Sequence, residues 1–505
     1  MKQVLEKYKV VVDFVEAEIK IIKNDEDFVD EYHVTLPEFP EATKEVIDEI
    51  REKLISGIKL YTGEILDPRK KTKLKQRVIE NALRIINEKF RDMPELKRKA
   101  LAGMIAHQMV GLGEIEIMLA DDNLEDITIN SASEPIWVFH RSYGWLKSNI
   151  KLESEEKTRN YASSIAREVL REITLLNPLL DAQMLSGDRV NATLYPISVF
   201  GNTMSIRKFR RRPWTIVNFI SPKFNTLSSE LAALIWQAIQ YGASLLVTGG
   251  TATGKTSMLN TLMLFVPPNE RIISIEETRE IALPKFFQWV ALVTRSPNPE
   301  GKGGISMHDL LVNALRMRPD RIIVGEVRRP EEVEVMFEAI HVGHPCYATI
   351  HADTAIQVQR RLMNPPFNLS TTMMEALQAI LVMYRDRRKE IRRVLEFVEV
   401  IPAGSIENPT IELSTIYKWD PKVDTQIQIT PMRRLREEIK LHTGMSDDEM
   451  RKDQKEKQTV LEYCLKHNIS GINEFARVIA NYYRNREKLL EIVRKDLDPK
   501  KILGK

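Results

Sequence analysis

Residues 249–256 constrain the fold of this chain more than any other segment. They read Gly-Gly-Thr-Ala-Thr-Gly-Lys-Thr and satisfy the pattern G-x-x-x-x-G-K-S/T at every fixed position. The apolar run 244–248 before them is typical of a buried parallel strand, and residues 257–264 after them are good helix formers. The segment therefore predicts a strand, a phosphate-binding loop and a helix, in the order found in α/β nucleotide-binding domains.

Such a loop binds phosphates because its backbone N–H groups surround them at the start of a helix. Lys255 supplies a cation for the β- and γ-phosphates, and the hydroxyl group of Thr256 is a ligand for Mg2+. We therefore expect ATP with Mg2+ as the bound group. The residues expected to hold it are Gly249, Gly250, Thr251, Ala252, Thr253, Gly254, Lys255, Thr256 and Ser257.

Length and composition narrow the class of protein. A chain of 505 residues holds about three domains, and its 43% apolar and 29% charged residues are the balance of a soluble globular protein. No apolar run approaches the roughly 18 residues of a spanning helix, and the first residues lack the apolar core of a signal peptide. We therefore expect a cytoplasmic protein. Its two cysteines, Cys346 and Cys464, provide neither a disulfide framework nor a four-thiolate zinc site.

The order of apolar and charged runs predicts an α/β P-loop (RecA-like) C-terminal ATPase domain with an α+β N-terminal domain and helical extensions at both ends. Short strands are expected at residues 271–275, 289–294, 321–324 and 347–350. The expected boundaries are 1–95 for an N-terminal helical module, 96–220 for the α+β domain, 221–226 for a linker, 227–408 for the ATPase domain and 409–505 for a C-terminal helical extension.

Two acidic segments are candidates for the chemistry of hydrolysis. The apolar run 321–324 resembles the strand of a Walker B element, but Gly325 stands where many such enzymes place an Mg2+-binding Asp. Glu326 is therefore expected to act on the metal, directly or through water, or on the attacking water. Glu276 and Glu277 follow the expected strand 271–275, at the edge of the sheet where the phosphate loop should lie. Glu276 is our choice for the residue that polarises the water.

Two histidines flank another expected strand. His344 precedes residues 347–350 and His351 follows them, so one imidazole is expected at each end of the strand. Their spacing does not suit a single metal site. His351 is expected to sense the γ-phosphate, and His344 is included among the nucleotide-binding candidates.

Four of these blocks, in this order, resemble the secretion-traffic ATPases, the hexameric motors of type II secretion, type IV pilus and archaellum assembly. The type IV secretion ATPases are more distant relatives of this family. Residues 249–256 look like the family's Walker A motif, 275–281 like its acidic Asp box, 307–326 like its Walker B region and 343–352 like its His box. Residues 111–115, 124–127, 187–190 and 205–209 resemble the family's N-terminal domain, so the resemblance covers about residues 100–400.

The resemblance implies a homo-hexamer that works on a membrane-embedded assembly platform, peripheral to the inner face of the cell membrane. It also implies that arginines reach the nucleotide, with Arg207 acting when the cleft closes and Arg279, Arg316 and Arg318 as further candidates. No nucleic acid is expected as a partner. The absence of a four-cysteine zinc module makes the chain look like the archaeal branch.

The chain departs from the family pattern at two site positions. Glu277 stands where Asp is common, which leaves open whether Glu276 or Glu277 polarises the water. Arg329 replaces the Gly usual after Glu-Val-Arg, so we expect an altered turn after the Walker B strand.

Two other functions remain open from the residues alone. A nucleic-acid translocase is one, because the basic runs 207–212 and 385–393 could line a channel. A scaffold that binds ATP without turnover is the other. The few aromatic residues near the basic runs argue against the first, and the joint presence of Glu276, Glu326 and His351 argues against the second.

Overall fold

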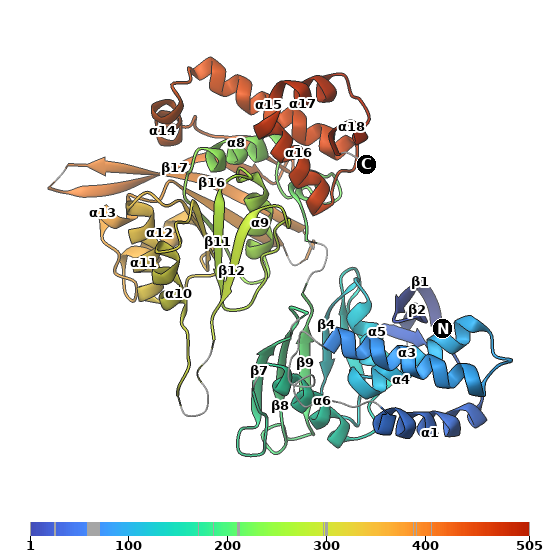
Figure 1. Ribbon diagram of the computed structural model, residues 1–505. Coiled ribbons are helices and arrows are strands. Elements are labelled where there is room, and N and C mark those ends of the chain that lie inside the picture. The colour runs from blue at the N-terminus through green and yellow to red at the C-terminus, as the bar shows by residue number, and fades with distance from the viewer. Residues whose placement is uncertain are drawn as a thin grey trace. The chain divides into compact units, whose positions relative to one another are not determined.

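The computed structural model describes the chain except for residues 1, 25–26, 58–70, 170, 185, 210–212, 296, 298–300, 387, 390, 406 and 504–505. The chain divides into two compact units, Met1–Arg211 and Arg212–Lys505. Unit 1 contains the first sheet and unit 2 contains the phosphate loop (Figure 1).

The core of unit 1 is a sheet of nine described strands in the order β1-β2-β3-β6-β5-β4-β9-β8-β7. Neighbouring strands are antiparallel except β3 and β6, which pair in parallel. Alternate residues of the strands face a single apolar cluster, which α5 and α6 also join. The strands are β1 (Lys2–Val12), β2 (Val15–Asn24), β3 (Glu31–Thr35), β4 (Leu124–Ile129), β5 (Pro135–His140), β6 (Gly144–Lys151), β7 (Leu179–Gln183), β8 (Arg189–Thr193) and β9 (Thr203–Arg207).

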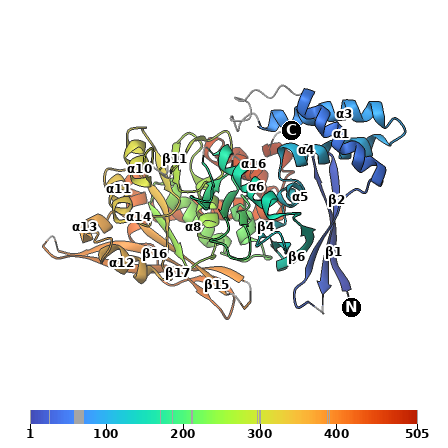
Figure 2. The same cartoon turned by 90° about the horizontal axis from the view of Figure 1, so that it is seen from below.

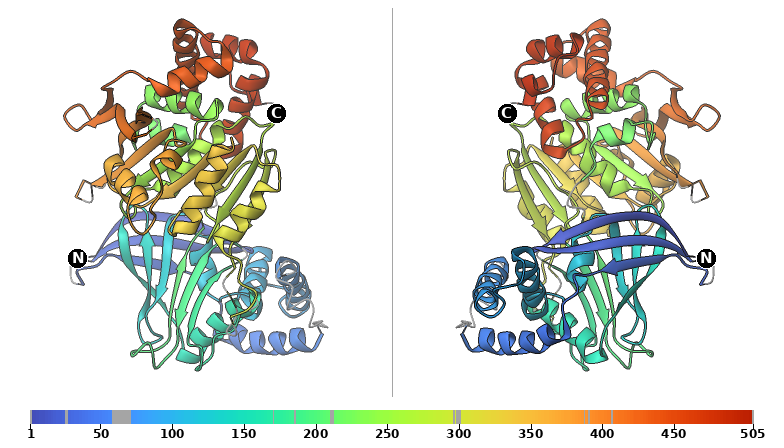
Figure 3. Two further views of the ribbon diagram at one scale, coloured as in Figure 1. Left: turned by 90° about the vertical axis from the view of Figure 1, so that its left-hand side faces the viewer. Right: turned by 90° about the vertical axis from the view of Figure 1, so that its right-hand side faces the viewer.

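The sequence predicts helices throughout residues 1–95, and for the first 35 residues that prediction is wrong. These residues form the long hairpin β1–β2 and strand β3 at one side of the sheet (Figure 3). Lys and Glu are good helix formers, but here they stand on the exposed face of the hairpin and pair across it, as in Lys7–Glu18 at 2.7 Å. In β2 the apolar residues alternate with them and point into the core.

Helices do follow from residue 41. Three of them, α1, α3 and α4, lie together and bury their own apolar cluster (Figure 2). Because β1 and β2 belong to the sheet core while these helices pack beside it, residues 1–95 are part of the N-terminal α+β unit and not a separate helical module. The helices of unit 1 are α1 (Glu41–Gly57), α3 (Lys71–Lys89), α4 (Glu95–Val110), α5 (Ile115–Ala120) and α6 (Glu155–Glu168).

Unit 2 is built on a second sheet of nine described strands in the order β12-β11-β13-β14-β10-β15-β16-β17-β18. The first six strands are parallel, and the last three continue the sheet in antiparallel pairs. The four strands predicted between residues 271 and 350 are confirmed. The strands are β10 (Leu245–Gly249), β11 (Arg271–Glu276), β12 (Gln288–Val293), β13 (Arg321–Val324), β14 (Cys346–Ile350), β15 (Ala379–Asp386), β16 (Ile391–Gly404), β17 (Pro409–Asp420) and β18 (Thr425–Gln428).

Helices cover both faces of this sheet, which is the arrangement that a buried parallel sheet requires. One apolar cluster joins the sheet to α7, α8, α9 and the C-terminal helices, and a second joins the other face to α10, α11, α12 and α13. The helices over the sheet are α7 (Ile216–Ile220), α8 (Ser229–Gln240), α9 (Lys255–Leu262), α10 (Met307–Leu315), α11 (Pro330–His341), α12 (Ala355–Met363) and α13 (Thr371–Met374).

Two predicted boundaries of unit 2 need correction. The expected linker 221–226 lies inside the unit, because Ile216, Phe219 and Ile220 of α7 are buried in the same core as Leu227. The expected helical extension from residue 409 begins only at α14, because β17 and β18 extend the sheet. Glu412 and Lys418 stand at exposed positions of β17, and the charged composition that predicted helices after residue 409 belongs mainly to α14 and α15.

The C-terminal helices pack over α8 and over the single 3-10 turn Met263–Phe265 that follows α9 (Figure 1). The hydroxyl group of Tyr483 donates to the carbonyl oxygen of Phe265 at 2.5 Å and accepts from Nε1 of Trp236 at 2.7 Å. Lys457 is buried against Asp453 and over the ring of Tyr482. These helices are α14 (Arg434–Thr443), α15 (Asp447–Lys466), α16 (Ile472–Arg484), α17 (Arg486–Arg494) and α18 (Lys500–Leu503).

Among the described residues, no helix combines the length and apolar character needed to cross a membrane.

Candidate nucleotide site

The phosphate loop joins the carboxyl end of β10 to the start of α9, as the sequence predicts. Strand β10 is hydrogen-bonded to β14 on one side and to β15 on the other, so the loop emerges within the sheet. Gly254 precedes α9 with φ of 93°, and no side chain caps the helix. The N–H groups of the first turn of α9 therefore remain available to an anion.

Gly249 shows why the loop begins with glycine. Its φ is 150°, and a Cβ atom there would lie 2.4 Å from the carbonyl oxygen of Met383 and 2.7 Å from Oγ1 of Thr253. Both distances are shorter than any real Cβ contact. The loop can therefore turn away from β15 only with a glycine at this position.

Lys255 points back over the loop. Its Nζ donates to the carbonyl oxygens of Gly249 at 3.0 Å and Gly250 at 3.1 Å, and lies 3.3 Å from Nδ1 of His351. Burial lowers the pKa of Lys255 from its ordinary value, while the carboxylate of Glu326 acts in the opposite direction. The amino group is thus held beside the open helix terminus, where a β- or γ-phosphate would lie.

These residues fit a triphosphate with a divalent cation. The uncapped terminus of α9 and the amino group of Lys255 provide donors for phosphate oxygens. The half-buried Thr256 lies in the first turn of α9 and offers a hydroxyl ligand, and Glu326 lies near the same loop through His351.

A line of polar side chains leads away from the loop along the carboxyl edge of the sheet. Nε2 of His351 lies 2.8 Å from Oε1 of Glu326. The other oxygen of Glu326, Oε2, accepts from Nη2 and Nε of Arg328 at 2.6 and 3.0 Å. Nη1 of Arg328 then donates to Glu277 at 2.7 Å. Burial and the charge of Lys255 lower the pKa of His351, which favours its neutral form.

Glu276 is placed differently from Glu277. Its side chain is 2% exposed, and its Oε1 accepts the backbone N–H groups of Glu280 and Ile281 at 2.8 and 2.9 Å. Its Oε2 is buried and has no hydrogen-bond partner among the described residues. Burial raises the pKa of Glu276 to about 7. Such a carboxyl group can exchange a proton near neutral pH.

Gly325 lies directly against Glu276. A Cβ atom at Gly325 would stand 3.1 Å from Cγ of Glu276 and 3.5 Å from its Cβ. The absence of a side chain in the expected metal-binding position of the Walker B strand therefore leaves room for Glu276. The two acidic segments that the sequence singled out meet at this point.

The other predicted site residues are not all brought to the loop. His351 follows the carboxyl end of β14 beside the loop, but His344 precedes the amino end of that strand, so the structure does not bring it to the site. Arg316 and Arg318 are exposed and precede the amino end of β13, on the same far edge. Arg279 lies on the loop's edge and stacks 5.3 Å from the ring centroid of Trp289.

Arg207 belongs to unit 1, at the end of β9. Its Nε donates to Oδ1 of Asp126 at 3.1 Å on the neighbouring strand, and its side chain is 73% exposed. Its expected contact with the nucleotide therefore stays a prediction.

Two arginines near the site were missed from the sequence. Arg328 follows Glu326 by two residues and returns to bind it. Arg392, from the expected basic turn, donates from Nε to the carbonyl oxygen of Ala252 in the phosphate loop at 3.2 Å. Its neighbour Arg393 is buried and paired with Asp424 at 2.6 Å. Arg328 could have been selected from the sequence because it lies two residues after Glu326. Arg392 could not, because the pairing of strands in the folded sheet brings it to the phosphate loop.

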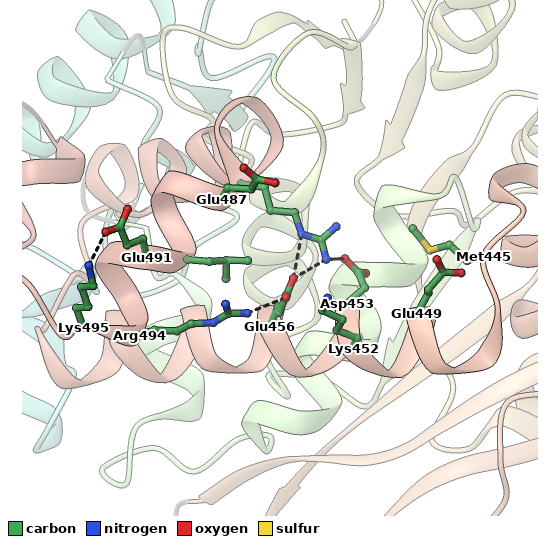
Figure 4. A pocket seen from close by; sticks show the side chains of 11 residues that line it. Met445, Glu449, Lys452, Asp453, Glu456, Glu487, Glu491, Arg494 and Lys495 are labelled. Carbon is green, nitrogen blue, oxygen red and sulfur yellow. Dashed lines mark hydrogen bonds and ion pairs between the residues drawn. The ribbon is translucent and has the colours of Figure 1, made fainter.

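A separate cavity of about 650 Å³ lies in the C-terminal helices, between α15 and α17 (Figure 4). Its charged side chains largely pair with one another: Arg486 and Arg494 both bind Glu456, and Lys495 binds Glu491. None of the residues that line it belongs to the phosphate loop or to the strands that carry the acidic residues. The cavity is therefore distinct from the nucleotide site.

Comparisons with known proteins identify the family of this chain. Residues 109–399 match the family model described as type II/IV secretion system protein. A protein of Methanocaldococcus jannaschii with no characterised function is 33% identical over 351 residues, 69% of this chain, and the chain spans 62% of that relative's length. A putative conjugal transfer protein of Mycobacterium tuberculosis is 30% identical over 60% of this chain and 89% of its own length.

Among solved structures, the pilus retraction motor PilT with bound ADP aligns with a TM-score of 0.43 and 20% identity, over 77% of this chain and 97% of its own. The family match takes in more than half of the sequence and contains every residue of the phosphate loop, the two acidic segments and His351. This chain therefore belongs to the type II/IV secretion system protein family.

Proposed function

We propose that this chain binds and hydrolyses ATP with Mg2+ and acts as a motor for a type IV pilus-like filament, an archaellum or a type II-like secretion system. The observation that carries the proposal is the contact of Lys255 with His351 and of His351 with Glu326 at the phosphate loop, with Glu276 packed against Gly325, the residue before Glu326. A phosphate loop alone would support nucleotide binding. The buried Glu276, with its raised pKa, supports hydrolysis.

Each residue has a role that follows from its position. Lys255 and the N–H groups of α9 bind the phosphates and offset their charge. The hydroxyl group of Thr256 would hold Mg2+, with Glu326 directly or through water, and bound Mg2+ would supply charge neutralisation at the phosphate oxygens. Glu276 would accept the proton of the attacking water. His351, kept neutral, donates or accepts a hydrogen bond near the terminal phosphate.

The assembly that we propose is a homo-hexamer at the cytoplasmic face of the membrane, where each subunit acts on a membrane-embedded platform protein. The family membership supports it. Arg207, Arg279, Arg316 and Arg318 remain candidates to reach the nucleotide of the same or a neighbouring subunit. The far-edge position of Arg316 and Arg318 in this chain favours a neighbouring subunit's nucleotide for these two.

The basic residues favour the motor over a nucleic-acid translocase. Arg393 is buried in an ion pair with Asp424, and Arg392 contacts the phosphate loop, so these members of the basic run have roles within the chain.

Two variants test the hydrolytic site. We expect Lys255→Ala to lose ATP binding, because it removes the cation at the loop. We expect Glu326→Gln to bind ATP with little change and to lose most of its turnover. The measurements are fluorescent-nucleotide titration and steady-state phosphate release, with the exposed Glu334→Gln as the control. Undiminished turnover in Glu326→Gln would remove Glu326 from the mechanism.

The class of partner is tested by measuring the ATP turnover of the wild-type chain at several protein concentrations. DNA and anionic lipid vesicles are added in separate titrations. A rate per subunit that rises with protein concentration, responds to lipid and ignores DNA is expected. Stimulation by DNA alone would favour the translocase.

A further inference from the structure

Arg328 makes three short contacts with two glutamates that come from different strands. Its Nε and Nη2 both donate to Oε2 of Glu326, at 3.0 and 2.6 Å, and its Nη1 donates to Oε2 of Glu277 at 2.7 Å. Glu326 follows β13 and Glu277 follows β11, and these strands are neighbours in the sheet. Arg328 therefore bridges the ends of two adjacent strands at the edge that carries the phosphate loop.

We propose that Arg328 is a positioning residue for Glu326, and that Glu277 acts only by holding Arg328. The inference rests on the proposed ATPase function and assigns the roles of the two neighbouring glutamates within it. Glu276 faces the buried side of the sheet's edge and accepts the proton of the attacking water. Glu277 faces Arg328 and orients the carboxylate of Glu326 through it.

The geometry at Glu326 gives the first argument. Arg328 donates twice to Oε2 of Glu326, and the other oxygen, Oε1, lies 2.8 Å from Nε2 of His351. With one oxygen held on each side, the carboxylate has one orientation, fixed between the guanidinium group and the imidazole. A chain of contacts then runs from Lys255 through His351 and Glu326 to Arg328 and Glu277.

The backbone of Arg328 is itself fixed, which gives the second argument. Oε2 of the buried Glu332 accepts the N–H groups of Arg328 at 2.9 Å and Arg329 at 3.1 Å. Arg329 is the N-cap of α11 and forms a capping box with Glu332, followed by Pro330. The expected altered turn after the Walker B strand is thus a regular helix start, and it aims the side chain of Arg328 back at Glu326.

Exposure gives the third argument. The side chains of Arg328 and Glu277 are 52% and 43% exposed, whereas that of Glu326 is 20% exposed. Exposed ion pairs contribute little to folding stability. The outer pair should therefore matter more for the orientation of Glu326 than for the stability of unit 2.

The test is a double-mutant cycle with Arg328→Gln, Glu277→Gln and the double variant in the full chain. We expect Arg328→Gln to lower kcat at least about tenfold while KM and the affinity for a fluorescent ATP analogue change less than about threefold. Glu277→Gln should lower kcat by a smaller factor. If Glu277 acts through Arg328, the double variant should turn over at the rate of Arg328→Gln alone.

Arg328→Lys keeps the charge but not the three contacts, so partial recovery of kcat relative to Arg328→Gln is expected. The exposed Glu334→Gln on α11 is the matched control and should match the wild type. Thermal unfolding of each variant separates positioning from folding, since a merely structural role would lower the melting temperature together with kcat.

The outcomes are distinct. Independent, multiplying losses in the double variant would show that Glu277 acts without Arg328 and would overturn the proposal. So would an Arg328→Gln variant with wild-type kcat. A wild-type chain that binds ATP and shows no turnover would overturn the proposed function itself, and the positioning role with it.

Discussion

Two opposing effects act on the pKa of the Glu276 carboxyl group. Two backbone N–H groups bind its Oε1 and favour the charged form, while burial of the side chain favours the neutral form and is the larger effect. Its pKa of about 7 lies well above the ordinary value near 4.5. The residue was selected from the sequence by its place after a strand, but burial, which determines its chemistry, could only come from the fold.

The raised pKa of Glu276 predicts how turnover depends on pH. A general base must be deprotonated, so the rate should rise as pH increases through about 7. The measurement is kcat from pH 5.5 to 8.5, with phosphate release as the readout. In Glu276→Gln we expect a large loss of kcat and no remaining inflection near 7. A wild-type inflection that persists in this variant would belong to another group.

The same shift predicts a change in stability with the opposite trend. Between about 4.5 and 7 the folded chain keeps a proton on Glu276 that the unfolded chain releases, so the free energy of unfolding falls as pH rises. Below about pH 4.5 Glu276 is protonated in both states, and its burial no longer lowers the free energy of unfolding. Relative to the wild type, Glu276→Gln should gain stability on the order of 3 kcal/mol between pH 4.5 and 8. Urea unfolding at pH 4.5, 6 and 8 measures it, and an unchanged difference across these pH values would contradict it.

At the scale of elements, strands with apolar composition were predictable and strands with charged faces were not. The buried strands β11, β13 and β14 have continuous apolar runs, which give the sequence a clear signal. Strand β1 places Glu6, Lys7 and Lys9 at exposed positions, and β17 does the same with Glu412 and Lys418. Their assignment depends on pairing with distant strands, which no local pattern contains.

The docking of α16 on the end of the phosphate-loop helix is a second feature that only the fold shows. The hydroxyl group of Tyr483 bonds the carbonyl oxygen of Phe265, just beyond α9, and the indole of Trp236 in α8. We expect Tyr483→Phe to lower the free energy of unfolding by about 1–3 kcal/mol, because two buried groups lose their partner. Urea unfolding measures the loss, with Tyr384→Phe at an exposed position of unit 2 as the control. Equal stability of the two variants would contradict the prediction.

At the scale of the whole molecule, the chain consists of two units with separate cores. The apolar clusters of the sheet in unit 2 contain no residue from unit 1, and those of unit 1 contain none from unit 2. The sequence predicts the junction of the two main domains at residues 221–226, about ten residues after the boundary between the two units. Ile220, Ser221 and Pro222 have the composition of a linker, and only the packing of α7 shows that they belong to the second unit.

The position of the junction can be tested with two fragments. Residues 213–505 keep α7 and the complete core of unit 2, so this fragment should fold cooperatively and bind a fluorescent ATP analogue. Residues 227–505 lack α7 and would expose its buried partners, so this fragment should unfold at a lower denaturant concentration or aggregate. Circular dichroism and nucleotide titration compare them. Equal behaviour of both fragments would return the junction to residues 221–226.

The contact between Gly325 and Glu276 also determines what can replace the glycine. A Cβ atom at position 325 would lie 3.1 Å from Cγ of Glu276, whose Oε1 is held by two backbone N–H groups. An aspartate at this position would therefore displace the side chain of Glu276 by a few tenths of an ångström and strain these two hydrogen bonds. A metal-binding aspartate in the Walker B strand and the present placement of Glu276 are thus alternatives, and this chain has the second.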